Sequence, residues 1–131
     1  MNPVRPFKID PEKPFFIFDT RGDAHGVVIG EYLYDMRGDY IGYQRNDIHD
    51  VYTGAGEWVG NIIEDGRIVR KRNFERPPLD ETKPKKQPTI RVTARVPLPP
   101  QTSDLGFNML DVMEWDDEVF KRLSDLTPDM D

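Results

Sequence analysis

The chain has 131 residues, enough for one folded domain with tails but not for two independent domains. It contains no cysteine, which excludes disulfides, thiol nucleophiles and thiolate metal sites. No stretch approaches the roughly 20 apolar residues that a membrane-spanning helix needs, and residues 1–14 have no apolar leader. We therefore expect a cytoplasmic protein with no membrane span.

The net charge of −6 is distributed unevenly along the chain. Residues 1–63 carry a net charge of −4, residues 64–100 carry +5 and residues 101–131 carry −7. Opposite charges attract within a Debye length of roughly 8–10 Å. The basic block and the acidic tail therefore either pair within the chain or meet separate partners.

After an N-terminal arm (residues 1–14), a nine-residue unit occurs three times, at residues 18–26, 34–42 and 52–60. Each copy reads aromatic-x-x-x-Gly-x-x-x-Gly, with an aliphatic residue before the aromatic and an acid after the first glycine. A unit this short cannot bury its own apolar face. The copies are therefore expected to assemble around one core.

Turn signals and runs rich in Phe, Tyr, Ile and Val predict a repeat β domain over residues 15–72. The expected strands are 15–20, 23–29, 32–36, 39–45, 48–53, 57–64 and 67–72. A two-residue turn at Arg21 and Gly22 would place Ile17 opposite Gly26. The other copies would then pair Leu33 with Gly42 and Val51 with Gly60. Glycine inside a strand marks a bulge or bend, and regular bending would close the meander into a barrel.

Residues 73–103 have the composition of a basic, proline-rich linker. It contains seven prolines: Pro77, Pro78, Pro84, Pro88, Pro97, Pro99 and Pro100. Within it, residues 89–96 alternate apolar and polar side chains, which predicts an eighth strand pairing with 67–72 across a long loop. A basic stretch, for which we expect solvation or pairing with the acidic tail, consists of Arg67, Arg70, Lys71, Arg72, Arg76, Lys83, Lys85 and Lys86.

The tail, residues 104–131, has apolar residues near helical spacing with acids between them. An acidic amphipathic helix is expected, with Asp104 as a cap and Pro128 as the stop. Such a helix either docks on its own barrel or enters a groove on another protein. The candidate partner-binding residues are Phe107, Leu110, Met113, Trp115, Phe120 and Leu123.

Aromatic residues are dense between residues 32 and 58. One interpretation is an aromatic-lined barrel mouth that holds an apolar ligand; the other is cross-strand packing over the interior glycines. The candidate ligand-binding residues are Tyr34, Tyr40, Tyr52 and Trp58.

No motif for catalysis or for a cofactor is evident. His25 and His49 are the only histidines, and no third metal ligand accompanies Asp47 and His49. We therefore expect surface histidines at turns, no metal site and no catalytic residue. Nucleic-acid binding is not favoured, because Phe74 alone interrupts the basic stretch and the acidic tail would compete for it.

The repeats, together with Asp65-Gly66-Arg67-Ile68-Val69, resemble the four-fold β-flower domains of bacteria, which repeat a similar Tyr-Asp-x-x-Gly-x-x-x-Gly hairpin around a shallow symmetric barrel. The resemblance covers residues 15–72 and implies a fold without an established activity. In the third copy Thr53 replaces the aspartate, and the fourth copy is reduced to Asp65-Gly66 and the three residues after it. Gly38-Asp39-Tyr40-Ile41-Gly42 is also similar to the PRC-barrel, but this rival accounts for one copy only.

The sequence thus predicts an all-β fold: a small meander barrel or flower of repeated hairpins, a linker and an acidic C-terminal helix. The leading functional hypothesis is a non-enzymatic protein-binding or adaptor module that uses the tail helix and the barrel surface. The alternative is a carrier that holds an apolar small molecule or lipid in the aromatic mouth. Either protein would need no cofactor.

Overall fold

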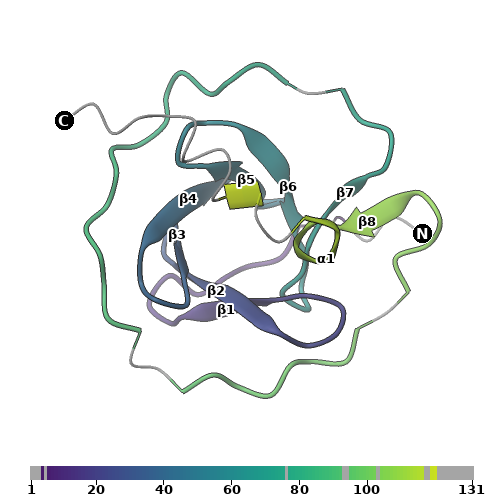
Figure 1. Cartoon of the computed structure of the whole chain (residues 1–131), viewed down its shortest axis with the longest axis horizontal. Coiled ribbons are helices and arrows are strands. Elements are labelled where there is room, and N and C mark those ends of the chain that lie inside the picture. The colour runs from purple at the N-terminus through teal and green to yellow at the C-terminus, as the bar shows by residue number, and fades with distance from the viewer. Residues whose placement is uncertain are drawn as a thin grey trace.

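The chain folds into an eight-stranded antiparallel meander that curls into a half-barrel, followed by one short helix (Figure 1). The structure, a computed structural model, describes residue 4 and residues 6–75, 77–92, 95–102, 104–116 and 119–120. The elements are β1 (Phe15–Phe18), β2 (Ala24–Ile29), β3 (Tyr32–Asp35), β4 (Tyr40–Arg45), β5 (Asp50–Thr53), β6 (Trp58–Ile62), β7 (Ile68–Lys71), β8 (Met109–Asp111) and α1 (Val112–Trp115). The first seven strands correspond to the seven predicted from the sequence.

The second glycine of each copy lies where the sequence predicts. Ile17 is opposite Gly26, Leu33 opposite Gly42 and Val51 opposite Gly60. In all three hairpins the register shifts directly after the aliphatic residue, so the expected bulge is confirmed.

The hairpin turn is one residue longer than predicted. In the first copy Asp19 N–H donates to Asp23 O and Gly22 N–H donates to Asp19 O, which encloses three residues rather than two. Gly22 has φ 93°, as expected where a type I turn is followed by a left-handed residue and a bulge. A fourth turn with the same two bonds joins Ile63, Gly66 and Arg67.

Backbone packs directly against the strand glycines. A Cβ on Gly26 would lie 2.5 Å from the carbonyl oxygen of Tyr34 in β3, and one on Gly60 would lie 2.6 Å from that of Val69 in β7. These glycines therefore allow neighbouring hairpins to approach closely and the sheet to curl.

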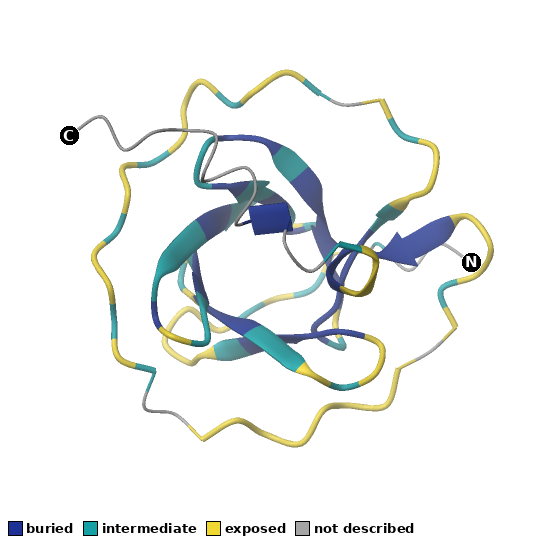
Figure 2. Cartoon of the chain, viewed as in Figure 1, coloured by how far each residue is buried: buried dark blue, intermediate teal, exposed yellow. Residues whose placement is uncertain are grey.

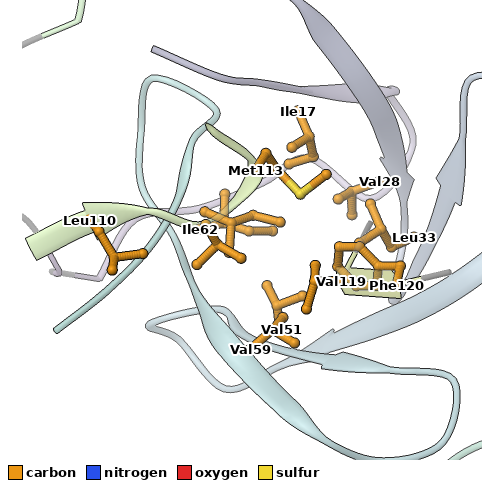
Figure 3. Close-up of a cluster of buried hydrophobic side chains, with 12 residues drawn as sticks. Ile17, Val28, Leu33, Val51, Val59, Ile62, Leu110, Met113, Val119 and Phe120 are labelled. Atoms are coloured by element: carbon orange, nitrogen blue, oxygen red, sulfur yellow. The ribbon is translucent and has the colours of Figure 1, made fainter. Parts of the chain in front are cut away.

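Aliphatic side chains from the concave face of the sheet fill its interior together with residues of the tail (Figure 3). Successive strand residues point to opposite faces, so Ile17 and Leu33 lie in this cluster whereas Phe16 and Tyr34 lie in an outer one. The complete inner cluster is Ile17, Val28, Leu33, Val51, Val59, Ile62, Ile68, Leu110, Val112, Met113, Val119 and Phe120.

The tail differs from the single helix expected for it. Met109–Asp111 forms β8, which pairs with β7, and α1 is a single turn. Val119 and Phe120 are also helical, and the remainder of the expected helix lies outside the described residues. Asp104 accepts the N–H of Gly106 in a turn, and Asp111 is the N-cap of α1. The free edge of β7 offers Met109–Asp111 a ladder of backbone hydrogen bonds, which outweighs a weak helical periodicity. Leu123 and Pro128 lie outside the described residues.

Between β7 and β8 the chain runs around the outside of the sheet as a largely exposed wrapping segment, whose described residues are 72–75, 77–92, 95–102 and 104–108 (Figure 2). No strand is present in its described part, so the strand expected at 89–96 is absent from residues 89–92 and 95–96, and β8 takes the predicted place beside β7. Ile90 and Val92 still bury apolar surface, because they pack, like Tyr40, against the outer cluster that contains Tyr34.

The wrapping segment is held at successive hairpin turns. Asp80 N–H donates to Gly56 O at 2.8 Å and Ile90 N–H donates to Gly38 O at 2.9 Å. The ring of Pro99 lies against Gly22: a Cβ added to Gly22 would be 3.1 Å from Pro99 Cγ. The segment therefore passes the turns of the third, second and first copies in that order.

Asp80 is the main polar anchor of this segment. Its Oδ2 accepts hydrogen bonds from the Tyr43 hydroxyl (2.6 Å) and from Arg45 Nη1 (2.8 Å), and Thr82 donates to Oδ1. Burial alone would raise the pKa of Asp80, but the hydrogen bonds from Tyr43 and Thr82 and the charge of Arg45 outweigh it and lower the pKa from 3.8 to about 2.

We expect Gly26→Ala to destabilise the protein by about 1–3 kcal/mol, because the new methyl group overpacks against the backbone of β3. Gly54→Ala is the matched control: its Cβ would come no closer than 3.5 Å to Tyr40, so a change within about 0.5 kcal/mol is expected. Urea unfolding measures both. Equal losses for the two variants would contradict the close-approach argument.

The anchoring of Asp80 should be acid-sensitive. Because its folded pKa lies below the ordinary value, its contribution to stability is full above pH 3.8 and is lost as the pH falls through about 2. NMR shifts of the Tyr43 ring, followed through this range, should change with a midpoint near 2. The change should disappear in Asp80→Asn and persist in Asp10→Asn, an exposed carboxylate on the arm; a transition retained in Asp80→Asn would refute the assignment.

Candidate functional site

The two ends of the curled sheet meet in a polar seam formed by the first and fourth hairpin turns and the start of α1. Phe18 N–H of β1 donates to Gly66 O at 3.0 Å. Thr20 donates to Asp111 Oδ2 through its backbone N–H (2.6 Å) and its hydroxyl (2.8 Å). The described strands β1 and β8 do not pair, so this network joins the ends of the sheet.

Arg67 is the cation of the seam, and its side chain is only 1% exposed. Its guanidinium makes hydrogen bonds of 2.7–3.1 Å with both carboxylate oxygens of Asp65, and Nη1 donates to the Thr20 hydroxyl at 3.2 Å. Of the two alternatives expected for the basic stretch, solvation is therefore wrong for Arg67. A buried ion pair is tolerated because both partners are hydrogen-bonded.

Asp111 connects the seam to the tail. While Oδ2 binds Thr20, Oδ1 accepts the N–H groups of Met113 (3.1 Å) and Glu114 (3.4 Å) at the start of α1. The two oxygens thus satisfy four donors. This carboxylate fixes the direction in which Val112 and Met113 enter the inner cluster.

A cavity of about 300 Å³, the seam cavity, lies beside this network. Charged side chains in its lining are Arg67, Arg72, Asp104, Asp111 and Glu114. Its wall also includes Gly106 and Trp115. With Arg67 paired to Asp65 and Asp111 satisfied by Thr20 and α1, the cavity presents the carboxylates of Asp104 and Glu114 against the guanidinium of Arg72.

The six residues predicted to bind a partner are divided by the structure. Leu110, Met113 and Phe120 are 7%, 5% and 3% exposed and belong to the inner cluster, so this part of the tail docks on its own sheet. Phe107 and Trp115 are 89% and 66% exposed. Leu123 lies outside the described residues.

The residues predicted to bind a ligand are divided between different contacts. Tyr34 and Tyr40 pack on the outer face with centroids 6.3 Å apart, and Tyr52 stacks on Tyr43 at 5.1 Å. Burial raises the pKa of Tyr40 to about 12, and its hydroxyl has no partner among the described residues. Trp58 lines a cavity of about 190 Å³ whose described lining includes none of the three tyrosines.

Both histidines make polar contacts with other residues of the protein. His25 Nε2 lies 2.8 Å from Asp19 Oδ2, while Asp19 Oδ1 accepts the turn N–H groups of Arg21 and Asp23. Burial alone would raise the pKa of Asp19, but the hydrogen bond from His25 and those of the turn lower it overall. Asp35 caps the second turn in the same way without a histidine, which indicates a turn-stabilising role.

His49 is 6% exposed, and the expectation of a surface histidine is therefore wrong for it. Its Nε2 lies 2.7 Å from Phe7 O and its Nδ1 lies 2.8 Å from Gln44 Oε1. This residue attaches the N-terminal arm to the sheet. Within the part of the chain that the structure describes, no three His, Asp or Glu side chains are grouped to hold a metal ion, and no helix is long and apolar enough to span a membrane.

Sequence reasoning missed Thr20, Asp65 and Asp111 as partners in one network. The available signal was the fourth copy, in which Arg67 stands where the other copies have an acid after the turn glycine. A basic residue at an acidic position of a repeat suggests a local partner. Asp65, two residues earlier, is such a partner, whereas Thr20, which also accepts a hydrogen bond from Arg67, comes from a turn 47 residues away.

Comparison of the chain with family models, with curated proteins and with solved structures found no match.

We expect Asp111→Ala to cost about 3 kcal/mol of stability, because it removes a helix cap and leaves Thr20 donors without an acceptor. Asp104→Ala also removes an acceptor of a backbone N–H, but at an exposed turn. Its expected cost is below about 1 kcal/mol. Urea unfolding distinguishes the two, and a similar small loss for both would show that the seam contributes little to closure.

Proposed function

We propose that this chain is a non-enzymatic protein-binding module whose contact surface is the seam cavity together with Phe107 and Trp115. The observation that carries the proposal is the exposure of two large aromatic side chains, 89% and 66%, around this cavity. Trp115 lines the cavity, and Phe107 follows Gly106, which also lines it. Exposed aromatic residues beside a pocket are typical anchors of protein interfaces.

Hydrogen bonds hold this surface in place before any partner arrives. Arg72 Nε donates to Phe107 O at 2.9 Å, and Asp104 Oδ1 accepts the N–H of Gly106 at 3.0 Å. Trp115 ends α1, whose first turn is capped by Asp111. A pre-organised surface loses less conformational entropy on binding, which supports a binding role for this loop.

The charge of the cavity suggests the partner's chemistry. Asp104 and Glu114 outnumber Arg72 among the exposed charged groups. A complementary partner would insert an apolar side chain and carry Lys or Arg beside it. One such cation could also stack on the Trp115 indole.

Burial of part of the tail reduces the number of residues that can contact a partner in the adaptor hypothesis. Leu110, Met113 and Phe120 stabilise the sheet interior, so the proposed contact uses only the exposed residues on either side of β8. The carrier alternative has less support, because the inner cluster occupies the concave face and the four aromatic residues named for it do not converge.

We also propose kinship with the four-fold β-flower domains. The support for it is the fourth turn at Ile63 and Gly66, which repeats the hydrogen bonds of the other three although its sequence has lost the aromatic and the second glycine.

Site-specific photo-crosslinking tests the binding proposal. A photoreactive phenylalanine at position 115 should give a discrete product in cells, whereas the same group at Leu98, which is 91% exposed on the wrapping segment, should not. Glu114→Lys should reduce the product at least tenfold by reversing the charge of the cavity, and the exposed control Glu81→Lys should not. The same products from positions 115 and 98 would refute the proposal.

A further inference from the structure

A second cavity, the Trp58 cavity, has a volume of about 190 Å³ and lies between β6, β7 and the start of the wrapping segment. Its polar lining is Asn61, Arg70 and Lys71, and the remaining lining is Val4, Trp58, Phe74 and Met109. Among the described residues that line this cavity two are cations and none is a carboxylate, although the chain as a whole carries a net charge of −6. The local charge therefore favours an anion.

Two aromatic rings form an ordered wall of the cavity. The Trp58 and Phe74 centroids are 5.6 Å apart with an interplanar angle of 55°, and Arg70 Cζ lies 4.5 Å from the Phe74 centroid. Trp58 Nε1 donates to Asp50 Oδ1 at 3.1 Å, which fixes the indole. These two inclined rings offer aromatic surface beside the cations.

Arg70 has an unmet hydrogen-bonding requirement. Its Nε is buried without a partner among the described residues. A buried donor on a charged group is costly when no acceptor satisfies it. Burial lowers the pKa of Arg70, and the charge of Asp116 offsets this only in part. A bound carboxylate would supply both the acceptor and the negative charge.

From this arrangement we propose that the Trp58 cavity binds a small planar carboxylate carrying one aromatic ring. The ring packs against Trp58 and Phe74, and the carboxylate lies on Arg70 with Lys71 nearby. The size is suitable, because a cavity of about 150 Å³ accepts benzene and this one has about 190 Å³. The site is separate from the proposed protein-binding surface, since of the residues lining the two cavities only Met109 is shared.

Titration of the full chain with benzoate tests the site, with the Trp58 indole N–H followed by NMR. We expect saturable shifts with a dissociation constant at or below about 1 mM. Benzamide, which keeps the planar ring but has no charge, and acetate, which keeps the charge but has no ring, should each bind at least tenfold more weakly. Absence of benzoate binding, or equal binding of benzamide or acetate, overturns the proposal.

Variants locate the binding. Arg70→Met should weaken benzoate binding at least tenfold, and Arg91→Met, which removes an exposed cation elsewhere on the wrapping segment, should leave it unchanged. If Arg70→Met does not fold, Lys71→Met and Phe74→Leu decide, because Lys71 is exposed and Phe74 only half-buried. Each should weaken benzoate binding about threefold or more, and unchanged affinity in both would refute the site. Trp115→Ala should not affect benzoate, which separates this test from that of the protein-binding surface.

Discussion

The close approach of backbone to glycine is the constraint on which this structure depends. At six glycines an added Cβ would come within 3.0 Å of a carbonyl oxygen from another segment: Gly26, Gly38, Gly42, Gly56, Gly60 and Gly66. The strand glycines allow each hairpin to pack closely against the next. The turn glycines allow another segment of the chain to pass close to the hairpin turn. Curling of the sheet and wrapping of the chain around it therefore have the same physical origin.

The same contact closes the sheet. At the third and second turns the glycine carbonyl accepts the N–H of Asp80 and Ile90 from the wrapping segment, whereas at the fourth turn Gly66 O accepts the N–H of Phe18 from β1. The first strand thus occupies, at the fourth turn, the position that the wrapping segment occupies elsewhere. The hydrogen bond from Phe18 N–H to Gly66 O is one backbone contact between the two ends of the sheet. The network of Thr20, Arg67 and Asp111 adds further polar contacts there, so the seam contributes to closure.

Local pattern was sufficient to predict the seven strands of residues 15–72 and the pairing of each strand glycine, because turn residues and alternation act over a few positions. It was not sufficient for β8, since the segment around Leu110 has apolar spacing compatible with a helix and becomes a strand only because β7 has a free edge. Nor could it reveal that Arg67 is buried, because the acceptor Thr20 comes from a distant turn. Trp115 was identifiable by type, but its exposure depends on where α1 ends.

Both cavities border the place where the repeat is broken. The fourth copy has Arg67 at the position of the acid and Arg70 at the position of the second glycine. A glycine at position 70 would let the neighbouring strand approach closely, as Tyr34 approaches Gly26. Arg70 instead places a long charged side chain there, which lines the Trp58 cavity, and Arg67 lines the seam cavity. The irregular copy therefore lacks the close backbone contact at position 70 and contributes an arginine to each cavity, so both proposed binding sites border it.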